Sequence, residues 1–202
     1  MTEVREVTRA DATRARLLDA AVAAFAEKGF HGTTTREIAA GAGVSSATLY
    51  VHHDSKEEML YLISRAGHEH TLRLIEEAIG PDPDPLPALQ RMVHAFAVNH
   101  ASDHTTARVI NYELSALSGP HFAEIRSIRH RTEGVIRALI ERGIAQRVFD
   151  VPDAQIATTV LISLGIDIAR WYRDGGRWDP EDLAQRYTAI GLRIVGARPA
   201  TL

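Results

Sequence analysis

Two seven-residue helical segments on either side of a short turn restrict the fold of this chain more than any other feature of its sequence. The first segment spans residues 35–41 and the second spans residues 46–52, in which Leu49 is the inward-facing apolar residue. Residues 42–44, Ala-Gly-Val, form a three-residue turn that contains glycine. Two short helices joined by such a turn predict a helix-turn-helix unit.

Capping residues indicate where the two short helices begin. Thr34 and Glu37 form a capping box, in which the threonine hydroxyl accepts from the Glu37 amide and the Glu37 carboxylate reaches back. Ser45 is a favourable N-cap for the second helix. Both helices of the unit therefore have predicted starting points.

Longer helices are predicted on both sides of this unit. Residues 13–28 place apolar side chains at helical spacing, and Gly29 follows as a C-terminal stop. A second capping box within residues 54–58 begins a long helix that runs to about residue 79.

The rest of the chain also has the pattern of helices. Residues 80–87 hold four of the eight prolines, and alternating proline cannot be helical, so we expect a boundary between two bodies there. No segment shows a competing strand pattern, and the chain is therefore expected to be all-α. Further helices are predicted over residues 86–101, 104–117, 120–143, 153–173 and 180–196.

Composition excludes several classes of protein and site. The chain has 202 residues and no cysteine, which rules out disulfides, thiolate metal sites and cysteine nucleophiles. No stretch approaches the roughly 18 apolar residues of a membrane span, and residues 1–10 lack the apolar run of a secretory signal, so we expect a cytoplasmic protein without membrane contact. The net charge is −3, and residues 1–60 carry seven basic and nine acidic side chains. Any contact with nucleic acid must therefore come from local placement of side chains.

Four short motifs follow one another at fixed spacing within residues 13–60. They are Thr-Thr-x-x-x-Ile-Ala at 34–40, Gly-Ala-Gly-Val-Ser at 41–45, Leu-Tyr-x-His at 49–52 and Ser-Lys-Glu at 55–57. In this combination the segment resembles the DNA-binding domain of the TetR family of transcriptional regulators. The family usually has phenylalanine after the motif histidine, whereas this chain has His53, so a core position beside the second short helix is expected to be more polar or packed differently.

The resemblance implies an all-α protein of about nine helices in two domains. Residues 1–60 would form a three-helix helix-turn-helix DNA-binding domain, and residues 61–202 a helical effector-binding and dimerisation domain. The implied function is a ligand-responsive, homodimeric transcriptional regulator, most simply a repressor released from a palindromic operator. Its partners would be double-stranded DNA, a small-molecule effector and a second copy of the chain, with no catalytic residue, metal or cofactor.

The second short helix has the side chains expected at a base-reading surface. A helix fits the major groove, and short hydroxylic or apolar side chains there select weakly by hydrogen bonding, so DNA shape would contribute to selectivity. The residues expected to face the groove are Ser45, Ser46, Ala47, Thr48, Tyr50 and Val51.

Flanking donors are expected to hold phosphates and to fix the register of the complex. Arg9, Arg14 and Arg16 are a weaker proposal for an arm or first-helix contact, and Arg5 is expected to be merely solvated. Three of the phosphate candidates also have a purely structural alternative. Thr34 could serve only as a helix cap, Tyr50 could lie in the core, and Lys56 could be an ordinary solvated charge. The residues assigned to phosphate contact are Thr34 or Thr35, Tyr50, His52 and Lys56, and Arg36 is also expected among the DNA-binding residues.

An effector site is predicted inside the second domain, where apolar walls with a few polar groups suit a small ligand. Residues 111–113 and 169–173 are similar to segments of TetR-family regulators of fatty-acyl or sterol catabolism in actinobacteria, which implies an acyl-CoA or other lipid-derived effector. The alternative for residues 167–173 is an ordinary helix terminus with boundary aromatics. The predicted lining residues are Met92, Phe96, Arg108, Asn111, Tyr112, Arg170 and Trp171.

A different class of function competes with this hypothesis. The chain would then be an all-α enzyme or small-molecule carrier that retains a non-functional helix-turn-helix. In the regulator hypothesis, by contrast, residues 153–196 supply the apolar helix faces through which two subunits would contact each other. The side chains available for catalysis in the second are His94, His100, His104, Glu113 and His121.

Overall fold

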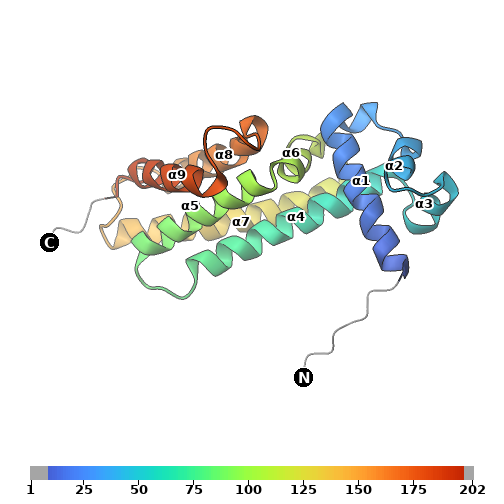
Figure 1. The fold of residues 1–202 in the computed structure, drawn as a ribbon. Coiled ribbons are helices and arrows are strands. Elements are labelled where there is room, and N and C mark those ends of the chain that lie inside the picture. The colour runs from blue at the N-terminus through green and yellow to red at the C-terminus, as the bar shows by residue number, and fades with distance from the viewer. Residues whose placement is uncertain (1–8, 198–202) are drawn as a thin grey trace, which may run out of the picture.

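The computed structural model describes residues 9–197, which form nine α-helices, one short 3₁₀-helix and no strand (Figure 1). The predicted all-α class is therefore confirmed. No helix within this range is both long and apolar enough to cross a membrane. The elements are α1 (Arg9–Gly32), α2 (Thr35–Gly41), α3 (Ser46–His52), α4 (Lys56–Ile79), α5 (Pro85–Ser102), α6 (His104–Tyr112), η1 (Leu114–Ala116), α7 (Gly119–Ala145), α8 (Ala154–Trp171) and α9 (Pro180–Ile194).

Helices α1, α2 and α3 lie together at one end of the molecule (Figure 1). They pack with the first turns of α4 around a core that includes Leu17, Phe25, Ile38 and Leu49. The bounds of α2 and α3 are those that the capping residues predict. α1 begins four residues earlier than predicted and is interrupted at Gly29, which takes positive φ (72°) where the sequence indicates a helix stop.

The proline-rich segment does not separate two bodies, so the predicted boundary at residues 80–87 is wrong. Ile79 of α4 and Leu89 of α5 belong to one hydrophobic core, and the intervening residues form a turn inside the helical bundle. Pro85 occupies the first turn of α5, where its missing N–H is not needed. The Asp84 carboxylate caps that helix by accepting from the Leu86 amide (3.0 Å).

The other predicted helices differ from the structure mainly at their ends. The helix predicted over residues 104–117 is too long, because Glu113 leaves helical geometry (φ −99°, ψ 9°) and the chain continues as η1. α8 ends at Trp171 and α9 at Ile194, each two residues before the predicted end. Apolar periodicity continues past all three points, so it did not reveal these ends.

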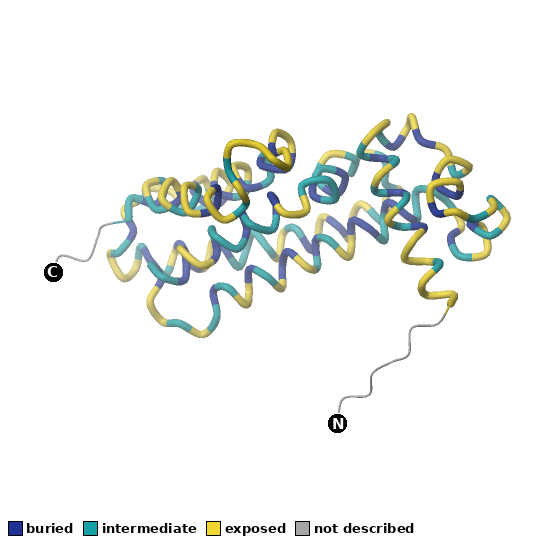
Figure 2. Tube along the Cα trace, in the orientation of Figure 1, coloured by how far each residue is buried: buried dark blue, intermediate teal, exposed yellow. Residues whose placement is uncertain are grey.

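Helices α4 to α9 form an elongated bundle that extends to one side of the N-terminal helices (Figure 1). Buried positions recur between exposed ones along α4 (Figure 2), as expected for an amphipathic helix. α4 contributes Leu60 to the N-terminal core and Ile75 to the bundle core, so one continuous helix spans both. α6 also reaches the N-terminal core, where its Val109 and Ile110 pack.

Candidate DNA-binding surface and interior chambers

Helix α3 turns one side to the protein core and the other to solvent. Leu49 is fully buried, whereas Tyr50 is 55% exposed and Val51 is 79% exposed. At its N-terminus the Ser45 hydroxyl accepts a hydrogen bond from the Thr48 amide (3.1 Å), the N-cap that the sequence predicts. α3 thus offers an outward-facing helix surface, the element that fits a major groove.

The predicted groove-facing side chains lie on this outward surface to different extents. Ser45 Oγ and Thr48 Oγ1 lie 2.9 Å apart and are hydrogen-bonded to each other, so the N-terminal hydroxyls of α3 are held in place. Ser46 and Thr48 are half-buried. The exposed members of the set are Ser45, Ala47, Tyr50 and Val51.

Tyr50 connects α3 to the start of α2. Its hydroxyl lies 3.1 Å from Thr35 Oγ1, which brings two of the predicted phosphate contacts side by side on one surface. Because Tyr50 is exposed, the alternative that places it in the core is wrong.

Thr34 acts as a cap in the way that the sequence predicts. The Glu37 amide donates to Thr34 Oγ1 (3.2 Å), and the Thr34 amide donates to Glu37 Oε2 (2.9 Å). Lys28 Nζ lies 2.6 Å from Glu37 Oε1, and this contact together with the Thr34 donors lowers the pKa of Glu37 to about 2. The carboxylate beside the predicted phosphate contacts therefore has a cation of its own, which reduces its repulsion of an approaching phosphate.

Lys56 has a structural role that sequence reasoning did not identify. Its ammonium group donates to Phe30 O and Thr33 O, each at 2.8 Å, and lies 4.3 Å from the centre of the Phe30 ring. The alternative of an ordinary solvated charge is therefore wrong. Two of the three ammonium protons tie the end of α1 to α4, and one remains for another acceptor.

The remaining predicted contacts lie on α1, α2 and α3, and all are at least partly accessible to solvent. His52 is half-buried at the end of α3. Arg5 lies outside the described residues. The exposed arginines of the set are Arg9, Arg14, Arg16 and Arg36.

His53 confirms the expected polar substitution in the core beside α3. It is 2% exposed, and neither ring nitrogen has a hydrogen-bond partner within the described part of the chain. The nearest carboxylate oxygen, Glu58 Oε2, lies 4.0 Å from His53 Nδ1. Burial lowers the pKa of His53, so the ring is neutral at physiological pH.

Helix α6 physically links the N-terminal helices to the bundle. Arg108 Nη2 donates to Ala26 O near the end of α1 (3.1 Å), and Ile110 packs in the N-terminal core. From the other side, His68 Nε2 on α4 donates to Ile110 O (3.0 Å). A shift of α6 would therefore change contacts with both α1 and α4.

The seven predicted effector residues do not line one cavity. Met92 and Phe96 line one hollow in the bundle. Asn111 lines a second hollow, and Phe96 is part of that lining too. Three more of the predicted residues line a cleft of about 220 Å³ between α1, α6 and α8. Trp171 lines a separate hollow at the surface. The prediction of one shared site failed because the sequence does not fix the rotation of one helix against another. The predicted residues in the cleft are Arg108, Tyr112 and Arg170.

A polar chamber of about 100 Å³ lies inside the bundle between α4, α5, α6, α7 and α8. His68 and His100 are buried beside it, and burial lowers the pKa of each to about 4, with the positive charge of Arg129 adding to the effect. Arg129 Nη1 donates to Asn111 Oδ1 (2.9 Å). The chamber is lined by His68, Thr71, Phe96, His100, Asn111, Arg129, Thr132, Glu133, Ile162 and Ile166.

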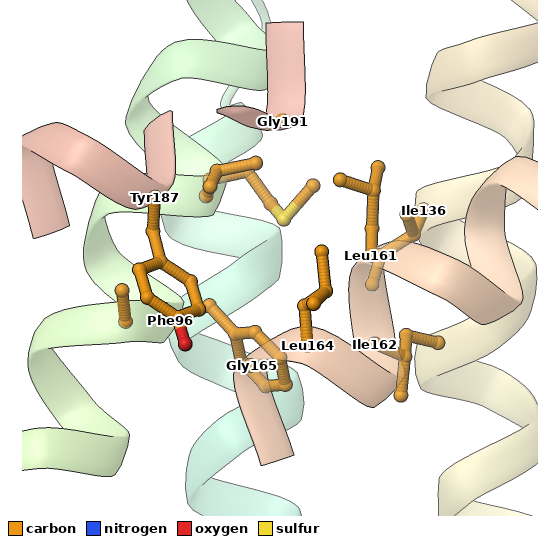
Figure 3. A pocket seen from close by; sticks show the side chains of 11 residues that line it. Phe96, Ile136, Leu161, Ile162, Leu164, Gly165, Tyr187 and Gly191 are labelled. Carbon is orange, nitrogen blue, oxygen red and sulfur yellow. The ribbon is translucent and has the colours of Figure 1, made fainter. Parts of the chain in front are cut away.

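An apolar chamber adjoins it, with Phe96 and Ile162 common to both linings (Figure 3). Its cavity volume is only about 10 Å³, so it is almost closed. The Phe96 ring lies directly against Gly165, where any Cβ would overlap it, so glycine is required for this packing. The chamber is lined by Met92, Val93, Phe96, Ala97, Ile136, Leu161, Ile162, Leu164, Gly165, Tyr187 and Gly191.

The polar residues of the polar chamber were largely missed by sequence reasoning. Arg129 lies on a helix with several arginines, and only its half-buried position distinguishes it from the exposed Arg126. His68 and His70 point to different sides of α4, as predicted from their spacing. Asp103 interrupts the helix between His100 and His104, and no group of three metal-ligating side chains occurs among residues 9–197.

The candidate catalytic side chains of the competing hypothesis lie apart. His94 Nε2 pairs with Glu181 (2.7 Å), whereas His121 Nδ1 pairs with Glu57 (2.9 Å) near the N-terminal helices. His100 is buried against the backbone carbonyl of Phe96. These three histidines therefore have separate partners on α9, α4 and α5 and form no common site with one another.

Helices α8 and α9 carry an unusual set of exposed apolar side chains. Ile168 and Leu183 of the same two helices are instead buried in the protein's own core. The apolar side chains exposed on these two helices include Ile156 (60%), Val160 (38%), Leu164 (37%) and Ile190 (45%).

Two family models match the chain. The model for bacterial regulatory proteins of the tetR family matches residues 17–61, and the model for the tetracyclin repressor-like C-terminal domain matches residues 82–195. The HTH-type transcriptional repressor KstR2 of Mycobacterium tuberculosis is 31% identical over 197 residues, covering 93% of this chain and 95% of the relative.

Solved structures have the same fold. A bacterial regulatory protein in the tetR family from Rhodococcus RHA1 has a TM-score of 0.88 and 40% identity, covering 93% of this chain and 98% of that chain. The ketosteroid transcriptional regulator KstR2 of Mycobacterium tuberculosis has a TM-score of 0.84 and 29% identity, covering 92% of this chain and 95% of that chain.

Proposed function

We propose that this chain, which belongs to the TetR family of bacterial regulatory proteins, is a cytoplasmic homodimeric repressor that leaves its operator when an effector enters the bundle. Members of the family are DNA-binding transcriptional regulators and not enzymes, so the chain is a regulator of this kind. Residues 1–60 form the DNA-binding domain in this proposal, and residues 61–202 bind the effector and the second subunit.

The outward surface of α3 is the observation that carries the proposal. Ala47 and Val51 are exposed apolar side chains that suit thymine methyl groups, and the linked hydroxyls of Thr35 and Tyr50 suit a phosphate beside them. The third ammonium proton of Lys56 is directed in this proposal to a neighbouring phosphate. The joint placement of Thr35 and Tyr50 beside the exposed side chains of α3 favours DNA binding over caps alone.

A dimer is needed because one chain supplies one recognition helix. Two half-sites about 34 to 36 Å apart on one face of DNA require two such helices. The exposed apolar side chains Ile156, Val160 and Ile190 suit an isologous contact in which α8 and α9 of two subunits pack together. The effector domain would then set the separation of the two α3 helices.

Effector binding reaches the DNA-binding domain through α6 in this proposal. Asn111 lines the polar chamber, whereas the neighbouring Ile110 packs in the N-terminal core. An effector that fits only one position of α6 shifts the dimer toward that geometry by its differential affinity. The similarity to the ketosteroid transcriptional regulator KstR2 supports a hydrophobic, lipid-derived effector for this chain.

Binding to a palindromic DNA fragment from the region upstream of the chain's own gene tests this function. Fluorescence anisotropy at several salt concentrations should give tight binding to the palindrome and at least tenfold weaker binding to a scrambled fragment, with affinity falling as salt rises. A salt-dependent affinity without sequence preference, or no binding, would contradict the proposal. Enzymatic turnover of a small molecule with no DNA binding would favour the competing class.

A further inference from the structure

The polar chamber contains a cation without an anionic partner. Arg129 is half-buried, its one hydrogen bond is to the neutral Asn111, and no carboxylate within residues 9–197 lies at ion-pair distance from it. A guanidinium group carries five N–H donors in a planar fork that matches the two oxygens of a carboxylate. Most of these donors have no acceptor within the same residues.

The carboxylate that also borders the chamber is already engaged. Glu133 accepts a hydrogen bond from Gln155 on α8, and its other oxygen lies 3.6 Å from His130. Among the described residues neither oxygen of Glu133 lies at ion-pair distance from Arg129, so Glu133 does not neutralise the guanidinium. A buried charge without a partner is costly, so the arrangement favours an anion from outside the chain.

The two buried histidines add a second requirement to the ligand. His68 donates from Nε2 to Ile110 O (3.0 Å), and His100 donates from Nδ1 to Phe96 O (2.9 Å). In a neutral imidazole the other nitrogen is then an acceptor. The chamber thus presents donors from Arg129 and acceptors from two histidines, which suits an anionic group with a hydroxyl beside it.

The apolar chamber provides the space for the rest of the ligand. Its walls are aliphatic apart from Tyr187, the Met92 sulfur and the Phe96 ring (Figure 3), and Phe96 lines the polar chamber as well. Rotation of this ring away from Gly165 would join the two spaces into one cavity that is polar at one end. An amphipathic ligand matches such a cavity.

We infer that the effector is an amphipathic carboxylic acid, whose carboxylate pairs with Arg129 in the polar chamber while its hydrocarbon part fills the apolar chamber. A hydroxyl near the carboxylate donates to His68 or His100. This inference rests on the proposed function and specifies the ligand class for it. Arg129 donates a hydrogen bond to Asn111 of α6. A ligand carboxylate that binds the guanidinium in place of Asn111 therefore also releases Asn111.

The test measures binding of defined probes to the full-length protein by isothermal titration calorimetry. The probes are 3-hydroxydecanoate, decanoate, the methyl ester of 3-hydroxydecanoate and its CoA thioester. Wild-type protein should bind 3-hydroxydecanoate most tightly, decanoate less tightly and the neutral ester at least about tenfold more weakly than the acid. Equal binding of acid and ester, preference for the CoA thioester, or no binding of either acid at about 1 mM would overturn the inference.

Variants of the chamber separate the charge effect from damage to the fold. Arg129→Gln should remove the preference for acid over ester, whereas Arg126→Gln on the exposed side of the same helix should retain it. Asn111→Asp keeps the side-chain shape and gives Arg129 an internal carboxylate, so it should also weaken binding of the acid. Unchanged acid preference in both Arg129→Gln and Asn111→Asp would contradict the assignment.

The operator fragment distinguishes failure of this inference from failure of the proposed function. 3-Hydroxydecanoate should release the wild type from the palindromic DNA, whereas it should not change the DNA affinity of Arg129→Gln, whatever that affinity is without ligand. DNA binding that responds to the neutral ester or the CoA thioester would overturn only the ligand class. Absence of specific DNA binding in the wild type would overturn the proposed function itself.

Discussion

Ile110 and Asn111 are consecutive residues of α6, yet their side chains belong to different parts of the molecule. Ile110 packs in the core of the N-terminal helices, and Asn111 lines the polar chamber and accepts a hydrogen bond from Arg129. Successive side chains on a helix point about 100° apart, so a single helix can face two compartments at once. α6 therefore connects the proposed effector site directly to the DNA-binding domain.

Replacing Lys56 tests a contact that the structure reveals and the sequence does not. Lys56→Ala should lower the free energy of unfolding by about 1 to 3 kcal/mol, because Phe30 O and Thr33 O lose a charged donor. It should also reduce the slope of DNA affinity against salt by about one unit if the third proton meets a phosphate. Urea unfolding and anisotropy measure the two effects.

The other lysine of the chain is the natural control for stability. Lys28 forms an exposed ion pair with Glu37, so Lys28→Ala should change the unfolding free energy much less. Equal losses of unfolding free energy in the two variants would show that the contacts of Lys56 with the buried carbonyls do not stabilise the fold.

Replacing His53 should make the DNA-binding domain more stable. The ring is buried without hydrogen bonds, so His53→Phe removes two unsatisfied polar atoms at nearly the same shape. We expect a gain of about 1 kcal/mol in urea unfolding at neutral pH, with a larger gain under mildly acidic conditions, where the unfolded histidine takes up a proton. A loss of stability would mean that the site cannot hold the larger ring.

The two chamber histidines predict a loss of stability in acid. In the unfolded chain they bind protons as the pH falls through about 6.5, whereas in the folded chain they remain neutral down to about pH 4. Because the unfolded state binds more protons in this window, the free energy of unfolding should fall by about 2 kcal/mol per histidine between pH 7.5 and pH 5.

Urea unfolding at the two pH values measures this effect. Replacing a chamber histidine, as in His100→Asn, should reduce the pH dependence. Replacing the exposed His130, as in His130→Gln, should leave it unchanged. Equal pH dependence in the wild type and both variants would contradict the assignment to the chamber.

The exposed face of α8 and α9 predicts a dimer that a charge can disrupt. Ile156→Glu combined with Ile190→Glu should convert the dimer to a monomer in analytical ultracentrifugation and weaken operator binding, because burying unpaired charges is costly. Phe122→Glu, at an exposed apolar residue of α7, should remain dimeric. A double variant that stays dimeric would place the interface elsewhere.

Local signals in the sequence predicted the DNA-binding surface far better than the effector site. Thr34 and Ser45 fix the starts of α2 and α3 through hydrogen bonds within a few residues, so a single stretch of sequence contains the necessary information. Their predicted contacts with DNA stay predictions.

The interior chambers depend on long-range packing instead. Arg129 and His68 face the same space only because α4 and α7 have particular rotations in the bundle, and no local pattern encodes these. Arg108 and Arg170 were predicted to face that space, but one donates to the end of α1 and the other pairs with Asp167 (2.9 Å). The turn at Pro85 shows the same limit, because a local helix break does not reveal whether the flanking helices share a core.

A charge placed on the outward surface of α3 tests the central claim most directly. Ala47→Glu puts a carboxylate at the exposed N-terminus of α3, where it favours the helix dipole and should leave thermal stability unchanged. Ala123→Glu adds the same charge on exposed α7, and Ala47→Ser keeps a small neutral side chain. In anisotropy with the palindromic fragment, we expect Ala47→Glu to lose at least about tenfold in affinity and both controls to bind nearly as the wild type does. Wild-type affinity in Ala47→Glu would contradict the assignment of α3 to the major groove.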